Sequence, residues 1–207
     1  MPYRNRIKDF YPDSYYHLYA RGINKRLLFH RTSDYTFFLY LLKKYLTPKF
    51  IEKKIVNGFE VEVEANGVSD LVKLHGYCLM PNHLHLLVQN VEVEGVQLLM
   101  RRVLTAYVRV FNKKYKREGP LIQGSYRCVP IHGEPQLIHT SRYIHLNPLK
   151  DGLVKKSIDY PYSSLKFYYA GTTFPIWLKR SAVIQSSTDF GKIDALLKVF
   201  EKEDNPI

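Results

Sequence analysis

The chain has 207 residues, 45% of them hydrophobic, which is enough for one domain with a real core and a short appendage. It carries 31 Lys and Arg against 19 Asp and Glu, a formal net charge of +12, so a polyanion such as nucleic acid or an anionic membrane is the favoured partner. A membrane-length apolar run, an apolar signal segment and a disulfide framework are all missing, which excludes a membrane protein and favours a cytoplasmic, nucleoid-associated one.

A basic turn follows the first predicted strand. Residues 15–20 are rich in β-forming side chains and predict that strand. The turn contains the cations Arg21, Lys25 and Arg26 around Gly22, which we expect to permit a positive φ. Two interpretations stay open for these cations: they hold a phosphate backbone, or they are simply solvated.

The next segment predicts a helix and then an exposed ribbon. Residues 32–34, Thr-Ser-Asp, supply an N-cap signal, and apolar residues at helical spacing continue to about Pro48. Residues 59–64 alternate apolar and acidic side chains between two Asn-Gly pairs, which is typical of a hairpin. Its acidic face would repel DNA, so we expect no direct role for it there.

The most informative stretch is a hairpin around Pro81-Asn82. Runs of β-formers at 72–79 and 83–89 flank this dipeptide, which suits a tight turn. Side chains alternate along a strand, so His83 and His85 share one face while the leucines beside them point to a core. Two neutral imidazoles side by side make half of a metal site. Two surface histidines on a half-exposed strand are the alternative interpretation.

A long basic helix is predicted from about Val96 to Lys116. Its apolar residues recur at three- and four-residue steps, and Tyr107 lies on that buried face, which favours a core aromatic over a nucleophile. Seven cations occur from Arg101 to Arg117 with no acid between them. Like charges repel along a helix, so this stripe favours nucleic-acid contact over a solvated face. The residues that we predict to contact DNA are Arg21, Lys25, Arg26, Arg101, Arg102, Arg109, Lys113, Lys116 and Arg127.

Residues 124–131 predict a fourth strand. The order strand, helix, strand, strand, helix, strand is the ferredoxin-like βαββαβ pattern, an α+β fold with a four-stranded antiparallel sheet and two helices on one face. We expect this domain over residues 1–150 and a small helical appendage over 151–207, with a helix near 193–200. The fold alone does not define a function.

A third helix is predicted from Pro135, which suits a first turn, to Pro148, which we expect to end it. On a helical wheel the apolar residues of this segment cluster on one side. Tyr143 and Asn147 are four residues apart and share another face, away from the core. Taken alone, each residue is better explained without a function, Tyr143 as an exposed tyrosine and Asn147 as an ordinary residue before proline.

The histidine hairpin and the third helix together resemble one enzyme family. Residues 79–86, Leu-Met-Pro-Asn-His-Leu-His-Leu, are similar to the signature of HUH single-strand endonucleases, two histidines around an apolar residue. Residues 143–152, Tyr-Ile-His-Leu-Asn-Pro-Leu-Lys-Asp-Gly, resemble the catalytic helix of REP-associated tyrosine transposases, which are insertion-sequence-200-like. The resemblance runs from about residue 15 to 169. The 60–64 ribbon and Ile122, where relatives often carry Trp, depart from the family's pattern.

This resemblance implies a role for each site residue. His83 and His85 would bind a divalent metal, Mg²⁺ or Mn²⁺, with Asn147 as third ligand and Tyr143 as nucleophile. The implied reaction is cleavage and strand transfer of single-stranded DNA near hairpins or palindromic repeats, through a 5′-phosphotyrosine and without ATP. His145 lies inside the motif and is a candidate for tuning proton transfer.

Two other functions stay open at this point. A metal-dependent nuclease that activates water would use the histidine pair but not Tyr143. A non-catalytic DNA- or RNA-binding module would explain the charge and the aromatic residues, but not why the histidine pair and the Tyr143/Asn147 pair coincide. The sequence also does not decide between a monomer and a homodimer.

Overall fold

The computed structural model of the chain describes residues 9–169, 172–181 and 184. At its centre is a four-stranded sheet built from β1 (Ser14–Arg21), β4 (Val72–Met80), β5 (His83–Asn90) and β6 (Arg127–Ile131). The order across the sheet is β4-β5-β1-β6, and every neighbouring pair is antiparallel. β1 and β5 are therefore the central strands, and they carry the histidines described below.

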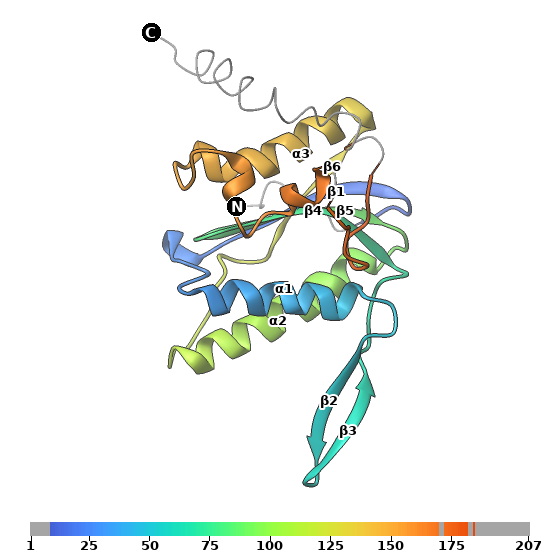
Figure 1. Cartoon of the computed structure of the whole chain (residues 1–207), viewed down its shortest axis with the longest axis vertical. Helices are drawn as coiled ribbons and strands as arrows, with labels where there is room; N and C mark the ends of the chain where they lie inside the picture. Colours follow the sequence, from blue (N-terminus) through green and yellow to red (C-terminus); the bar gives the residue numbers. More distant parts are fainter. Residues whose placement is uncertain (1–8, 170–171, 182–183, 185–207) are drawn as a thin grey trace.

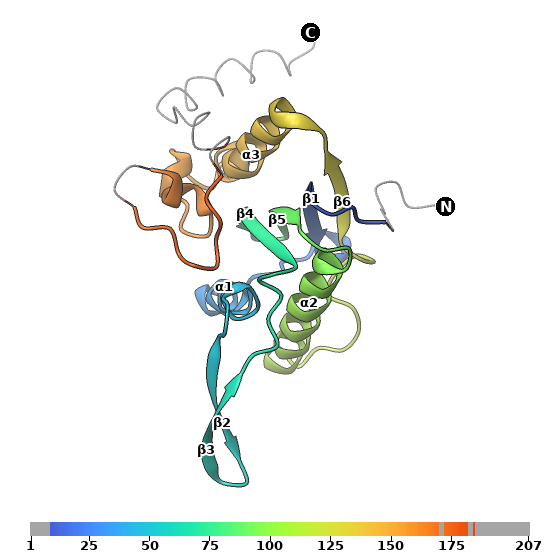
Figure 2. The same ribbon diagram turned by 90° about the vertical axis from the view of Figure 1, so that its right-hand side faces the viewer.

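Helices cover both faces of this sheet (Figures 1 and 2). α1 (Thr32–Leu46) and α2 (Gly95–Lys114) lie on one face and enclose the main hydrophobic core. α3 (Gly133–Lys150) lies on the other face, above a smaller core that includes Leu87 and Ile144. The α+β class, the antiparallel sheet and the two helices on one face are as predicted. No helix in the described part of the chain has the length and apolar surface needed to cross a membrane.

A two-stranded ribbon projects from the end of α1, away from the sheet and its helices (Figure 1). It consists of β2 (Ile51–Val56) and β3 (Phe59–Glu64), which pair antiparallel, as the alternating pattern predicts. An ion pair between Lys44 and Glu52, with 2.6 Å between Nζ and Oε2, holds the ribbon to α1. The ribbon supplies no residue to the candidate site.

The start of β6 and the end of α3 differ from the predicted boundaries. β6 begins only at Arg127, so residues 124–126 precede the strand. α3 continues through Pro148 to Lys150 instead of ending at the proline. A proline lacks one backbone N–H, and in the last turn of a helix this removes a single hydrogen bond without interrupting a long ladder.

The segment after α3 covers the outer edge of β4. It passes through two short 3₁₀ turns, η2 (Ser157–Asp159) and η3 (Ser164–Tyr168). The backbone N–H of Leu79 donates to the carbonyl oxygen of Tyr162 (3.0 Å), so this edge is not left open to other strands. The helix predicted near 193–200 lies outside the described residues, and a domain boundary at residue 150 stays a prediction.

His145 is buried between α3 and the sheet. Its Nε2 lies 2.8 Å from the Ser164 hydroxyl, and its Nδ1 lies 3.3 Å from the Ser141 hydroxyl. Burial lowers the pKa of His145 to about 4. The contact with Ser164 holds α3 to η3, which indicates a structural role for the residue that the sequence singled out for proton transfer.

We expect the protein to lose stability as the pH falls from about 6.5 towards 4. The pKa of His145 is lower in the folded than in the unfolded chain, so its protonation favours unfolding. The contribution of neutral His145 to the free energy of unfolding is fully present above the pKa of the unfolded chain. It declines, by up to about 3 kcal/mol, as the pH falls to the pKa of the folded chain. Denaturant titrations between about pH 7.5 and pH 4.5 measure the slope. The His145→Gln variant should flatten it, and an unchanged slope would assign the acid sensitivity to other groups.

Candidate active site

β5 presents His83 and His85 on the face of the sheet that α3 covers. His83 is opposite Arg21 of β1, and His85 is opposite Tyr19, so all four side chains share that face. The centroids of the two imidazole rings are 4.9 Å apart. The structure thus places both imidazoles together, as the alternation of side chains predicts. Their role as metal ligands stays a prediction.

α3 places Tyr143 and Asn147 over the histidines. The centroid of the Tyr143 ring lies 5.5 Å from that of His85 and 5.9 Å from that of His17. Nδ2 of Asn147 donates to the Tyr143 carbonyl oxygen one turn earlier (2.9 Å). Tyr143 is 40% exposed but Asn147 only 6%, because the sheet beneath α3 buries it. The expectation that both lie away from the core is therefore wrong for Asn147.

One ring nitrogen of each histidine has a hydrogen-bond partner. Nδ1 of His83 lies 2.7 Å from the amide oxygen of Asn82, and Nδ1 of His85 lies 2.8 Å from Nε2 of His17. An amide oxygen only accepts, so Nδ1 of His83 donates and its Nε2 keeps a lone pair. The Asn147 side chain also lies within hydrogen-bonding reach of the His83 ring.

Burial keeps both imidazoles neutral. Desolvation lowers the pKa of His83 below its usual value; the Asp151 carboxylate opposes this shift, and Arg21 adds to it. Desolvation also lowers the pKa of His85 well below 6.5, and the neighbouring rings of His17 and His83 contribute. The neutral ring is the form that binds a metal, so the site does not have to release protons near neutral pH to do so.

The donor atoms fit a divalent metal. Nε2 of His85 is buried and has no hydrogen-bond partner among the described residues, and a cation would satisfy it. His83, His85 and Asn147 offer two nitrogens and an oxygen, a mixed set that suits Mn²⁺ and also Mg²⁺. No group of three or more His, Cys, Asp and Glu side chains in the described part of the chain is arranged to hold a metal. A metal site here would therefore need a third ligand of another type, and the Asn147 amide is the candidate that the sequence predicts.

Four of the predicted DNA contacts lie near this site. Arg21 is opposite His83, and Arg127 of β6 is on the same face of the neighbouring strand. Lys25 and Arg26 lie in the loop that follows β1, which contains the short turn η1 (Ile23–Lys25). These cations gather at the end of β1 that is nearest the histidine hairpin, and their contact with DNA stays a prediction.

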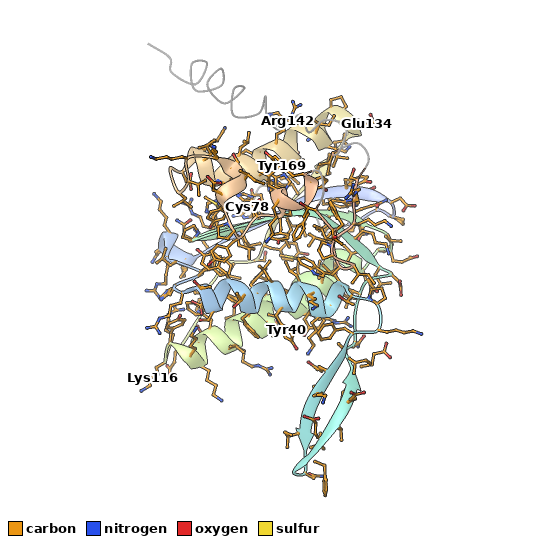
Figure 3. The ribbon with its side chains drawn as sticks, viewed as in Figure 1. Tyr40, Cys78, Lys116, Glu134, Arg142 and Tyr169 are labelled. Atoms are coloured by element: carbon orange, nitrogen blue, oxygen red, sulfur yellow. The ribbon has the colours of Figure 1, made fainter. Side chains whose placement is uncertain are left out.

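The other predicted contacts lie on the opposite side of the sheet. They belong to α2 or to the turn just after it, and α2 lies on the face that α1 shares (Figure 1). Figure 3 shows Lys116 at the end of this helix, on the far side of the sheet from Arg142 on α3. The structure therefore does not bring these cations to the candidate site. They are Arg101, Arg102, Arg109, Lys113 and Lys116.

The arginines of α2 have different surroundings. The guanidinium of Arg102 donates to the carbonyl oxygens of Asn66 (2.6 Å) and Gly67 (2.9 Å), so it anchors the segment after β3. Arg101 and Arg109 instead line a cavity of about 990 Å³, together with mostly apolar residues of α2 and of the segment before β6. Of these three arginines, Arg101 and Arg109 line a cavity that could bind a ligand, whereas Arg102 is engaged by the backbone.

Gly22 does not use the positive φ that glycine permits. Its φ is −63°, and the positive values occur at Asn24 (52°) and Lys25 (60°). Glycine is required because a Cβ at position 22 would lie 2.0 Å from the carbonyl oxygen of Arg26. The Gly22 N–H donates to the Asn82 carbonyl oxygen (2.8 Å), which joins the basic loop to the histidine hairpin.

Gly22→Ala should disturb both the fold and the site. The added Cβ meets backbone, which moves less easily than a side chain, so we expect a loss of roughly 1–3 kcal/mol in the free energy of unfolding. Chemical denaturation measures it. Gly58→Ala is the control, because a Cβ there has no atom within 4 Å and adds only the strain of a φ of +84°. Equal stability of Gly22→Ala and wild type would contradict this account of the loop.

His17 is a site residue that the sequence analysis missed. Its ring centroid lies 5.0 Å from that of His85, and it is two residues before Tyr19 on β1. The alternation along residues 15–20 places His17 on one face of a strand. Only the pairing of β1 with β5 shows that this is the face of the histidine pair. Asp151, which directly follows α3 and opposes the lowering of the His83 pKa by desolvation, was also missed. Only the packing of α3 on the sheet brings Asp151 near that ring.

The chain is similar to known transposases. The sequence pattern of the family described as "Transposase IS200 like" matches residues 11–147. A Haemophilus influenzae protein named a REP-associated tyrosine transposase is 32% identical over 98 residues, which are 42% of this chain and 55% of that protein. The match thus spans about half the length of this curated relative.

A solved structure shares the fold. It is the structure of a REP-associated tyrosine transposase bound to a REP hairpin, with a TM-score of 0.60 over 87% of this chain and 93% of that chain. The sequence identity is 17%, so this likeness concerns the fold. The family pattern, by contrast, covers more than half of the chain and includes the histidine hairpin, Tyr143 and Asn147. The chain belongs to the family of IS200-like transposases.

Proposed function

We propose that this chain cleaves and rejoins single-stranded DNA through a 5′-phosphotyrosine formed on Tyr143. The observation that carries the proposal is the position of Tyr143, 40% exposed and with its ring centroid 5.5 Å from that of His85. An accessible phenol beside two neutral imidazoles is the arrangement that a metal-assisted tyrosine nucleophile needs. Membership of a transposase family supports the reaction class.

His83, His85 and Asn147 would hold the divalent metal, Mn²⁺ or Mg²⁺. When bound, the metal supplies Lewis acidity that offsets the negative charge of a phosphodiester. All three ligands are neutral, so the protein adds no negative charge of its own to oppose the phosphate. Arg21 and Arg127 add positive charge on the same face and would position the strand by its backbone.

The chemical step uses Tyr143 as nucleophile. Its oxygen attacks phosphorus, the Tyr143 oxygen–phosphorus bond forms, and the phosphorus–O3′ bond breaks. The phenol proton leaves to solvent, and the departing O3′ takes a proton from solvent to become a 3′-OH. Attack by another 3′-OH reverses the step and joins new ends. No ATP is needed, because the phosphotyrosine bond conserves the energy of the bond that was broken.

We expect the substrate to be a single strand beside a hairpin or palindromic repeat. A strand laid across the α3 face of the sheet can reach Tyr143, which is held above that face by its helix. The relative of known structure was solved with a REP hairpin, which supports a hairpin partner here. The cations of α2 lie on the opposite face and would contact flanking DNA, not the reacting phosphate. One copy of the chain supplies the nucleophile and all three ligands, so the reaction does not require a homodimer.

A denaturing-gel assay tests the proposal. Purified protein is mixed with labelled single-stranded hairpin oligonucleotides and Mn²⁺ or Mg²⁺, and a parallel sample contains EDTA. We expect a slow-migrating, protease-sensitive adduct and a released fragment with a 3′-OH, both lost on chelation. Metal-dependent cutting without an adduct would instead establish a nuclease that uses water. Binding without cutting on a broad panel of hairpins would establish a binding module.

A further inference from the structure

We infer that His17 is a positioning residue for the metal site, because its Nε2 accepts the Nδ1–H of His85 and turns the His85 Nε2 lone pair towards the metal. This inference rests on the proposed function, since it concerns the same three ligands. It adds a residue from a third element, β1, to a site otherwise built on β5 and α3.

The pairing of the two central strands holds His17 in place. β1 and β5 are antiparallel over eight residue pairs, and His17 and His85 lie one diagonal step apart on the same face. Nε2 of His17 is 2.8 Å from Nδ1 of His85, and the ring centroids are 5.0 Å apart. Two strands at the centre of a sheet move little relative to each other, so this contact fixes the rotation of the His85 ring.

The direction of this hydrogen bond decides whether His85 can bind a metal. If His17 donates, the neutral His85 ring carries its proton on Nε2, and that N–H is buried with no acceptor among the described residues. If His85 donates from Nδ1, its Nε2 keeps a lone pair at the same buried position. Only the second arrangement leaves a ligand atom, and a cation there removes the unsatisfied group.

The other histidine ligand has the same kind of support. Nδ1 of His83 donates to the amide oxygen of Asn82 at 2.7 Å, which leaves its Nε2 for the metal. Both ligands are therefore oriented through Nδ1 by a neighbouring acceptor. An acceptor on the second ring nitrogen of a metal-binding histidine fixes its tautomer and orientation, and its loss typically weakens metal binding by about 10–100-fold.

Titration of metal-free protein with Mn²⁺, followed by electron paramagnetic resonance, tests this role without DNA or catalysis. His17→Leu removes the acceptor and should weaken Mn²⁺ binding about 10–100-fold. His17→Gln offers an amide oxygen near the position of Nε2 and should bind within about threefold of wild type, by the same reasoning. His139→Leu, at an exposed histidine of α3, is the matched control and should have no effect.

A nuclear magnetic resonance measurement of imidazole nitrogens in the metal-free protein gives the second readout. We expect the proton on Nδ1 in both His17 and His85, a result that a merely space-filling role for His17 would not produce. A proton on Nε2 of His85, or equal Mn²⁺ affinity of His17→Leu and wild type, would overturn the inference while leaving the metal site intact. If wild-type protein binds no more Mn²⁺ than His85→Ala, which lacks a proposed ligand, the proposed metal site and this inference are both overturned.

Discussion

Tyr143→Phe should abolish the covalent protein–DNA adduct while DNA binding stays within about threefold of wild type. The change removes one oxygen, and no other nucleophile replaces it, so adduct formation should fall by roughly a thousandfold or more. The ring remains, and with it the contacts to His17 and His85 at 5.9 and 5.5 Å between centroids. The denaturing gel measures the adduct, and a gel-shift or anisotropy titration measures binding.

The neighbouring tyrosine Tyr19 makes the sharpest control for this experiment. Its ring centroid lies 6.2 Å from that of His85 on the same face, so Tyr19→Phe should keep the adduct. Tyr107, which the helical pattern predicts to be a core aromatic and not a nucleophile, is buried on the other face of the sheet. Its hydroxyl donates to the Leu28 carbonyl oxygen (2.5 Å). An adduct that survives in Tyr143→Phe and disappears in Tyr19→Phe would move the nucleophile to β1.

His85→Ala and His83→Ala should each remove metal-dependent cleavage. Each change takes away one of three ligands, and two remaining donors hold a divalent ion poorly, so we expect cleavage to fall at least about a hundredfold. His85 should show the larger loss, because it is buried and hydrogen bonded to His17. Cleavage rates over a range of Mn²⁺ concentrations separate weaker binding, which excess metal partly restores, from a loss that it does not restore.

Stability must be measured alongside, because removing a buried imidazole leaves a cavity. Thermal unfolding of metal-free wild type, His85→Ala and His139→Ala provides this comparison; His139 is exposed on α3 and should be silent in both assays. A folded His83→Ala or His85→Ala variant with undiminished cleavage would contradict the assignment of the histidine pair as ligands. If His85→Ala loses cleavage because it no longer folds, His83→Ala becomes the decisive variant, since His83 is the less buried of the two histidines.

Local patterns in the sequence predicted most of the elements and two halves of the site. The alternation along 83–89 placed His83 and His85 on one face, and the four-residue spacing placed Tyr143 one turn from Asn147. These predictions succeed because the repeats of a strand and a helix are local properties of the backbone. The α+β class and the antiparallel sheet followed from the order of the elements for a similar reason.

Where several segments meet, local patterns were not enough. The local sequence suggests that Gly22 is present to permit a positive φ, but the structure requires glycine because the Arg26 carbonyl oxygen approaches it closely. Asn147 was placed on an exposed face, but the sheet buries it. The charge of the α2 cations predicts DNA contact but not its position, and their helix lies on the side of the sheet away from the candidate site (Figure 1).

The sequence by itself determined which residue types the site has and on which elements they lie: an imidazole pair on a strand, a phenol and an amide one helical turn apart, and an excess of cations. Only the tertiary structure decided that β1 pairs with β5 so that His17 meets His85, and that α3 and α2 lie on opposite faces. The physical reason is that strand register and the choice of sheet face depend on burying apolar surface from segments far apart in the chain. The repeating pattern of side chains within one strand or helix therefore does not predict which strands pair or which face of the sheet a helix covers.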